Sequence, residues 1–122
     1  MKRTIFISLI LLALTSCKSK KELEEIYDEA GYAIGKITKS TNIAYVLTYY
    51  YEYQVANTTY KGEKNGGVTN TDDNRMIGRQ FLVVYKQSDP KKSDLNFKYP
   101  IETEQDFLDM LDRFKNEPPS KK

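Results

Sequence analysis

Hydrophobic and polar residues alternate along much of the chain, and this period of two predicts a mainly β protein. Residues 33–40 alternate in this way, and residues 42–55 are rich in the aromatic and β-branched side chains that suit a long strand. Residues 79–87 form an apolar run, which is typical of a strand buried on both faces. Residues 95–101 alternate again and are predicted to be an edge strand, because Pro100 has no backbone N–H to donate.

Polar segments that contain glycine or proline separate these strands and predict the connections between them. We expect a turn at residues 56–59 before a return strand that starts at Tyr60, and a long loop at residues 63–78. A further turn is expected at residues 88–94, which include Pro90. Together these segments predict a small, strongly bent, barrel-like antiparallel sheet of about five strands.

Two segments space their apolar residues as helices do. In residues 102–116, Thr103 is a predicted N-cap and Asp106 completes a capping box. The apolar stripe of this C-terminal helix is expected to cover one opening of the bent sheet and consists of Phe107, Leu108, Leu111 and Phe114. Residues 18–30 are highly charged and end before Gly31, so we expect a solvated tether in which any helix is brief.

Five tyrosines fall within residues 45–53, and strand alternation divides them between two faces. The larger face is predicted to be core or core rim, because aromatic rings bury much area in a small module without disulfides, and it holds Tyr45, Leu47, Tyr49, Tyr51, Tyr53 and Val55. Tyr50 and Glu52 point the other way and are the predicted partner-binding residues. An ordinary solvated position is the alternative for Glu52.

The N-terminus has the features of an export signal. A positive start with Lys2 and Arg3 precedes the apolar run 5–14, which is too short to span a bilayer. The sequence Leu14-Thr15-Ser16-Cys17 resembles the lipobox of bacterial lipoproteins. That resemblance implies cleavage before Cys17 and attachment of a diacylglycerol to its thiol. The alternative is an ordinary signal peptide followed by a free thiol.

The lipobox divides the chain into a signal peptide (1–16), a lipidated cysteine with its tether (17–30), a β module with its C-terminal helix (31–117) and a tail (118–122). Removing Lys2 and Arg3 from the 19 Lys and Arg leaves 17, which equals the 17 Asp and Glu. A nucleic-acid partner is not expected, because such partners require a basic surplus. Lysines rather than acidic residues follow Cys17, which favours the periplasmic side of the outer membrane.

Two further motifs resemble a widespread bacterial domain family of unknown function. Residues 50–62, YYEYQVANTTYKG, are similar to its Y-x-Y-x-V-N-G-x-x-Y-x-G hairpin, and residues 78–95 are similar to its second motif. The resemblance spans Gly31 to Ile101 and implies a small membrane-anchored β module. Asn57-Thr58 stands where the family usually has Asn-Gly, so we expect a longer turn than the two-residue type I′ form.

The chain offers little catalytic chemistry. It contains no histidine, and its single cysteine is the predicted lipidation site, so the usual general base and a thiol nucleophile are both missing. Asp72 and Asp73 lie in the long loop and are candidates for partner binding, since no later acid completes a calcium site. We therefore expect neither a metal nor another cofactor.

These observations predict a non-enzymatic envelope lipoprotein that is anchored to a membrane by lipid and binds a protein or an envelope component. One alternative is a periplasmic immunity protein that neutralises a toxin from neighbouring bacteria. Another is an enzyme or ligand carrier that uses Glu52 or the acidic loop. Exposed strand edges leave a dimer formed by edge pairing open.

Overall fold

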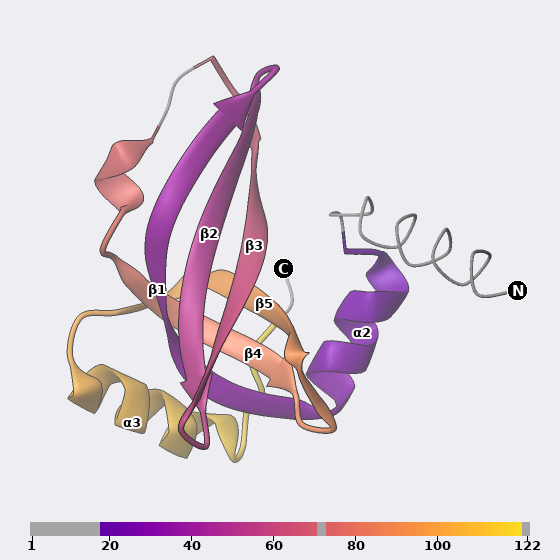
Figure 1. The fold of residues 1–122 in the computed structure, drawn as a ribbon. Coiled ribbons are helices and arrows are strands. Elements are labelled where there is room, and N and C mark those ends of the chain that lie inside the picture. Colours follow the sequence, from indigo (N-terminus) through magenta and orange to yellow (C-terminus); the bar gives the residue numbers. More distant parts are fainter. Residues whose placement is uncertain (1–17, 71–72, 121–122) are drawn as a thin grey trace, which may run out of the picture.

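The computed structural model describes residues 18–70 and 73–120, and it is a five-stranded antiparallel sheet with two helices (Figure 1). The elements are α2 (Lys20–Asp28), β1 (Ala30–Ile43), β2 (Val46–Val55), β3 (Thr58–Val68), the 3-10 turn η1 (Asn74–Met76), β4 (Gln80–Lys86), β5 (Asp89–Ile101) and α3 (Glu104–Phe114). The strand order is β3-β2-β1-β4-β5. The predicted fold class, a bent antiparallel sheet with a C-terminal helix, is confirmed.

The sheet curls into a half-barrel, so that its two edge strands approach each other. β3 and β5 lie at opposite ends of the hydrogen-bonded order, yet they are in contact. Side chains of β2 and β5, which two strands separate, also meet: the rings of Tyr49 and Phe97 are 5.6 Å apart. Such contacts are made across the concave face, which therefore encloses a core.

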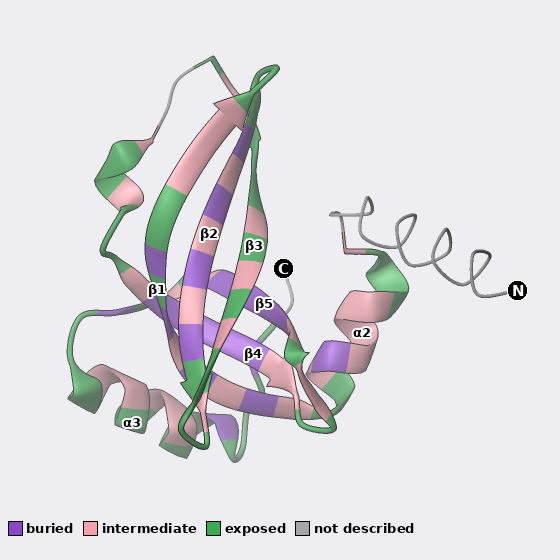
Figure 2. Cartoon of the chain, in the orientation of Figure 1, coloured by how far each residue is buried: buried purple, intermediate pink, exposed green. Residues whose placement is uncertain are grey.

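The concave core consists of Ala33, Ile37, Leu47, Tyr49, Tyr51, Tyr53, Phe81, Val83 and Leu95. Burial alternates along β2, as Figure 2 shows, and Tyr49, Tyr51 and Tyr53 are all buried there. The prediction that these three rings are structural is confirmed. Tyr45 does not join them, because it lies in a turn and is largely exposed.

A second core lies on the convex face, where both helices pack. It is made of Ile26, Leu82, Val84, Ile101 and Phe114, with Tyr32 and Phe107 among the partly buried residues around it. β4 contributes to both cores, which explains its continuous apolar run and confirms the prediction of burial on both faces. The hydrophobic residues that face the helices come from β1, β4 and β5.

The predicted long strand 42–55 is wrong at its first residues. β1 continues to Ile43, and the chain reverses at Ala44 and Tyr45, whose φ angles of 52° and 68° are left-handed. No glycine or proline marks this turn, so the alternation of the flanking strands concealed it.

Two predicted connections are also shorter than expected. The long loop at residues 63–78 is wrong in its first part, because β3 continues to Val68. The turn at residues 88–94 is wrong, because the chain reverses at Gln87–Ser88 and Pro90 lies within the edge strand β5. Both segments are paired to a neighbouring strand, and pairing overrides their polar composition.

The β2–β3 turn is a two-residue turn, and the expectation of a longer one is wrong. Val55 pairs with Thr58, and Ala56 and Asn57 between them have φ angles of 49° and 69°. Left-handed values at both central residues define the type I′ turn.

Helix α3 forms as predicted at its start. The Thr103 hydroxyl accepts from the Asp106 N–H, and the Asp106 carboxylate accepts from the Thr103 N–H, which is a complete capping box. The helix packs against the convex face rather than over an opening of the sheet, so that expectation is wrong. Leu108 is exposed, whereas Met110 packs against the core.

The N-terminal segment is a helix and not a solvated tether over residues 20–28. Ser19 caps α2, because its hydroxyl accepts from the Glu22 N–H. Ile26 in the last turn of the helix is fully buried in the convex core. The helical spacing of its apolar residues was the correct signal, and the high charge does not oppose the helix because the charged side chains stay partly or fully exposed.

Candidate functional site

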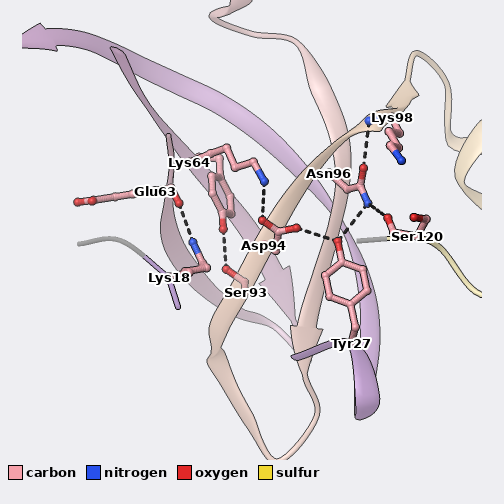
Figure 3. Close-up of polar contacts among 10 residues, drawn as sticks. Lys18, Tyr27, Glu63, Lys64, Ser93, Asp94, Asn96, Lys98 and Ser120 are labelled. Atoms are coloured by element: carbon pink, nitrogen blue, oxygen red, sulfur yellow. Dashed lines mark hydrogen bonds and ion pairs between the residues drawn. The ribbon is translucent and has the colours of Figure 1, made fainter. Parts of the chain in front are cut away.

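A polar network lies at the seam between β3 and β5, and Figure 3 shows its residues. Lys64 on β3 places its Nζ 2.7 Å from Oδ1 of Asp94 on β5. Asp94 is buried, while Lys64 is about a quarter exposed. Beside them the Tyr51 and Ser93 hydroxyls are 2.8 Å apart. The Lys64–Asp94 pair joins β3 to β5, which share no ladder of backbone hydrogen bonds, and the Tyr51–Ser93 pair joins β2 to β5.

Asp94 also holds helix α2, and its neighbour on the same face of β5, Asn96, holds the C-terminal segment. The Tyr27 hydroxyl donates to Oδ2 of Asp94 at 2.7 Å. The Asn96 side-chain amide donates to the Tyr27 oxygen at 3.0 Å and to the Ser120 carbonyl at 2.8 Å (Figure 3). Three segments that are distant in sequence, α2, β3 and the C-terminal segment, therefore converge on two buried side chains of β5.

The electrostatics of this network indicate a structural role. Burial, with the charge of Asp94 added, raises the pKa of Tyr27, and burial raises the pKa of Tyr51. Both phenols therefore stay neutral and serve as hydrogen-bond partners rather than as bases. Within residues 18–70 and 73–120, every buried side-chain polar atom has a partner. A network without a free acceptor or donor is suited to fastening the fold.

A cavity of about 270 Å³ lies next to the seam, between the start of α2 and strands β2 and β3. Its walls include Lys18, Leu23, Val46, Lys64 and Asp94. The Lys18 Nζ donates to the Glu63 carbonyl at 2.9 Å, and burial lowers the pKa of this ammonium group. The residue that follows Cys17 is therefore held against the folded body.

Tyr50 and Glu52, the predicted partner-binding residues, lie together on the convex side of β2. They line a hollow of about 370 Å³ with Thr38, Lys39 and Lys61. The Lys39 ammonium lies 5.4 Å from the centre of the Tyr50 ring. Tyr50 is half-buried and sits among charges of both signs, an arrangement that suits contact with a polar partner.

The structure separates Asp73 from that surface. Its carboxylate accepts from the Tyr49 hydroxyl at 3.1 Å and from Nε of Arg75 at 3.3 Å, so it docks the β3–β4 connection onto the concave face. Tyr49 and Tyr50 point to opposite faces of β2. Asp72 and Cys17 lie outside the described residues, as does the signal peptide.

Sequence reasoning missed an apolar patch at the β1–β2 turn. We name it the tip patch and define it as Ile43, Tyr45, Val46 and Val68, all of which are exposed. Alternation had assigned Tyr45 to the core, and Val68 to a polar loop. A signal was present nonetheless, because residues 40–51 and 65–70 contain no charged side chain.

The described residues were compared with the arrangements that hold a metal ion or cross a membrane. No group of three or more metal-binding side chains occurs there. No described helix is long and apolar enough to cross a membrane. Comparison of the chain with protein-family models, curated proteins and solved structures found no match.

Proposed function

We propose that this protein is a bacterial envelope lipoprotein, anchored through Cys17, whose β module binds a protein or another envelope component without catalysis. The observation that carries the binding part of this proposal is the position of Tyr50. Its ring is half-exposed in a hollow of the convex face that Lys39 and Lys61 also line. Glu52 lies two positions later on the same face of β2. Tyrosine is enriched in binding surfaces and in their energetic hot spots, and polar residues commonly form the rim around it.

The uncovered state of this surface supports the proposal. Helices α2 and α3 pack on β1, β4 and β5, and their apolar partners belong to those strands. The hollow at Tyr50 lies instead over β2 and β3, at the other end of the strand order. A partner can therefore reach it without displacing a helix.

The anchoring part rests on the sequence before Lys18. Leu14-Thr15-Ser16-Cys17 has the residue types that lipid modification requires, and an apolar run precedes it. Only Lys18 and Ser19 separate Cys17 from α2, and both are bonded to the folded body. A lipid on Cys17 would thus hold the module close to the bilayer on the periplasmic side of the outer membrane.

The test uses a photocrosslinking amino acid placed at Tyr50 of the full chain in intact bacterial cells. We expect a crosslinked product of defined mass, because the side chain at this position faces outward. The matched control places the same group at Leu108, which is exposed on α3 and belongs to a different surface. A Glu52→Lys variant should weaken the product at position 50 while leaving folding and membrane fractionation intact.

The identity of the crosslinked partner decides between two forms of the proposal. A resident envelope protein or polymer indicates envelope assembly, and an imported toxin indicates an immunity protein. Equal crosslinking at positions 50 and 108, or none at position 50 in membrane-bound protein, would contradict the binding surface. A Cys17→Ala variant that still fractionates with membranes would contradict the lipid anchor.

A further inference from the structure

The tip patch is the largest concentration of exposed apolar side chains that the described residues show. Ile43, Tyr45, Val46 and Val68 are 71%, 65%, 41% and 83% exposed. Val46 pairs with Ile43 across the β1–β2 turn and with Val68 across β2 and β3. Residues that pair directly in an antiparallel sheet share a face, so Ile43, Val46 and Val68 form one surface, and Tyr45 lies in the turn at its end.

Charged residues are missing from the two segments that form the tip, and those nearest to it line the cavity beside Val46. Residues 40–51 and 65–70 contain no Asp, Glu, Lys or Arg, although these types make up 30% of the chain. An uncharged, apolar end with a tyrosine can enter a membrane interface without burying a charge.

The tip is ordered by its own hydrogen bonds. The Thr69 N–H donates to the Tyr45 carbonyl at 2.8 Å, and the Asn42 side-chain amide donates to the Thr69 carbonyl at 2.9 Å. Tyr45 itself has a left-handed φ of 68°, which is unfavourable for an aromatic residue. The backbone therefore projects this ring into solvent in a conformation that costs free energy, which favours a role outside folding.

The position of Lys18, where the described residues begin, bears on the occupant of the patch. Lys18 is bonded to the Glu63 carbonyl and lines the same cavity as Val46. Along β3, the backbone from Glu63 to Val68 covers about 17 Å at the usual strand rise. Figure 1 shows that the first residues of α2 lie nearer the β1–β2 turn than its last residues do. Cys17 therefore precedes a residue whose side chain is bonded to β3 about 17 Å from the Val68 end of the tip patch.

We propose that the tip patch inserts into the surface of the lipid bilayer that holds the lipidated Cys17. This inference rests on the lipid anchor of the proposed function. The acyl chains would bring the tip to the bilayer, and the patch would supply a second contact that fixes the orientation of the module. With the anchor and tip at the membrane, the module would stand with a defined side toward the lipid.

The chain contains no tryptophan, so a single Tyr45→Trp substitution gives a unique fluorescent probe at the tip. The lipidated full chain is reconstituted into phosphatidylethanolamine and phosphatidylglycerol vesicles that contain brominated acyl chains. We expect emission at shorter wavelength and a loss of intensity of about twofold, since an inserted interfacial side chain lies near the acyl boundary. The matched control is Leu108→Trp, which should show neither change.

A second variant tests whether the apolar surface causes the insertion. Val68→Asp, added to Tyr45→Trp, should restore the intensity while the protein stays on the vesicles through its lipid. Circular dichroism of each variant checks that the fold is kept.

The outcomes separate the two proposals. Equal quenching at positions 45 and 108 in vesicle-bound protein overturns the inserted tip and leaves the lipid anchor standing. A shift to shorter wavelength without quenching by the lipid also overturns it, because the tip would then contact protein. Protein that carries no acyl chains by mass and does not float with vesicles overturns both.

Discussion

The Tyr27 hydroxyl donates a 2.7 Å hydrogen bond to the carboxylate of Asp94, which lies 67 positions later in the chain. Through this bond the first helix is fastened to the last strand. The other carboxylate oxygen is 2.7 Å from the Lys64 ammonium, so one buried acid joins α2, β3 and β5. If Cys17 carries the lipid, the same acid links the membrane-proximal helix to both edges of the half-barrel.

Tyr27→Phe removes the hydroxyl from this network and leaves the ring in place. Because the lost bond has a charged, buried acceptor, we expect the free energy of unfolding to fall by about 2 kcal/mol. Urea unfolding followed by circular dichroism measures this change. The matched control is Tyr50→Phe, for which we expect a change within about 0.5 kcal/mol because the side chain is partly exposed. An equal loss in the free energy of unfolding for the two substitutions would show that the Tyr27 hydroxyl adds little to stability.

Gly62→Ala tests how closely β3 approaches the concave core. A Cβ at position 62 would overlap the Tyr51 ring, and that ring is almost fully buried and cannot move aside. We expect a loss of about 2 kcal/mol in the free energy of unfolding, as is usual for overpacking. Urea unfolding of the purified protein measures it.

A double variant separates this overlap from other effects of the glycine. In the background of Tyr51→Leu, the side chain that clashes is smaller, so Gly62→Ala should then cost less than about 1 kcal/mol. An unchanged cost in the two backgrounds would argue against contact between Gly62 and Tyr51 and in favour of a backbone cause.

The sequence predicted the fold class because hydrophobic alternation was strong where strands are half-buried. Tyr49, Tyr51 and Tyr53 were assigned correctly on this basis, and the burial of β4 on both faces followed from its unbroken apolar run. The β1–β2 turn was missed because Ala44 and Tyr45 have no turn signature and their left-handed backbone depends on the pairing of the flanking strands. Tertiary pairing determined these details.

The candidate site was predictable only in part, for a related reason. Alternation alone placed Tyr50 and Glu52 outward, since one strand suffices for that inference. Asp94 carried no comparable signal, because its partners Tyr27 and Lys64 come from segments 67 and 30 positions away. The curl of the sheet brings them together, and alternation along a single strand does not give that curl.

The β2–β3 turn should be improved by Ala56→Asn together with Asn57→Gly. Both central residues have left-handed φ angles, and Asn-Gly is the preferred pair for such a type I′ turn. We expect the free energy of unfolding to rise by about 1 kcal/mol, because left-handed conformations are unfavourable for alanine. Thermal and urea unfolding would both report it.

The matched control for this substitution is the turn at Gln87 and Ser88, where φ is not left-handed. Gln87→Asn with Ser88→Gly should give no stabilisation there and should lower the free energy of unfolding, because it also removes the hydrogen bonds from the Gln87 amide to the Ala30 carbonyl and from the Ser88 hydroxyl to the Glu29 carboxylate. A comparable rise in the free energy of unfolding at both turns would contradict the claim that relief of the left-handed φ angles stabilises the β2–β3 turn. It would point to a change in solvation instead.

The capping box of α3 should make stability depend on pH in the acidic range. The N–H groups of Glu102 and Thr103 donate to the Asp106 carboxylate and hold its pKa below the ordinary value of 3.8. Since the folded state binds this proton more weakly than the unfolded state, the stabilisation is present above pH 3.8 and is lost as the pH falls through the folded value. Asp106→Asn should therefore lower the melting temperature at neutral pH, and the difference from the wild-type chain should shrink in acid. The control Asp109→Asn removes the same charge from a later turn of α3. Its difference in melting temperature from the wild-type chain should not shrink in acid. A difference for Asp106→Asn that stays constant from neutral to strongly acidic pH would mean that the amide replaces the carboxylate in the capping box.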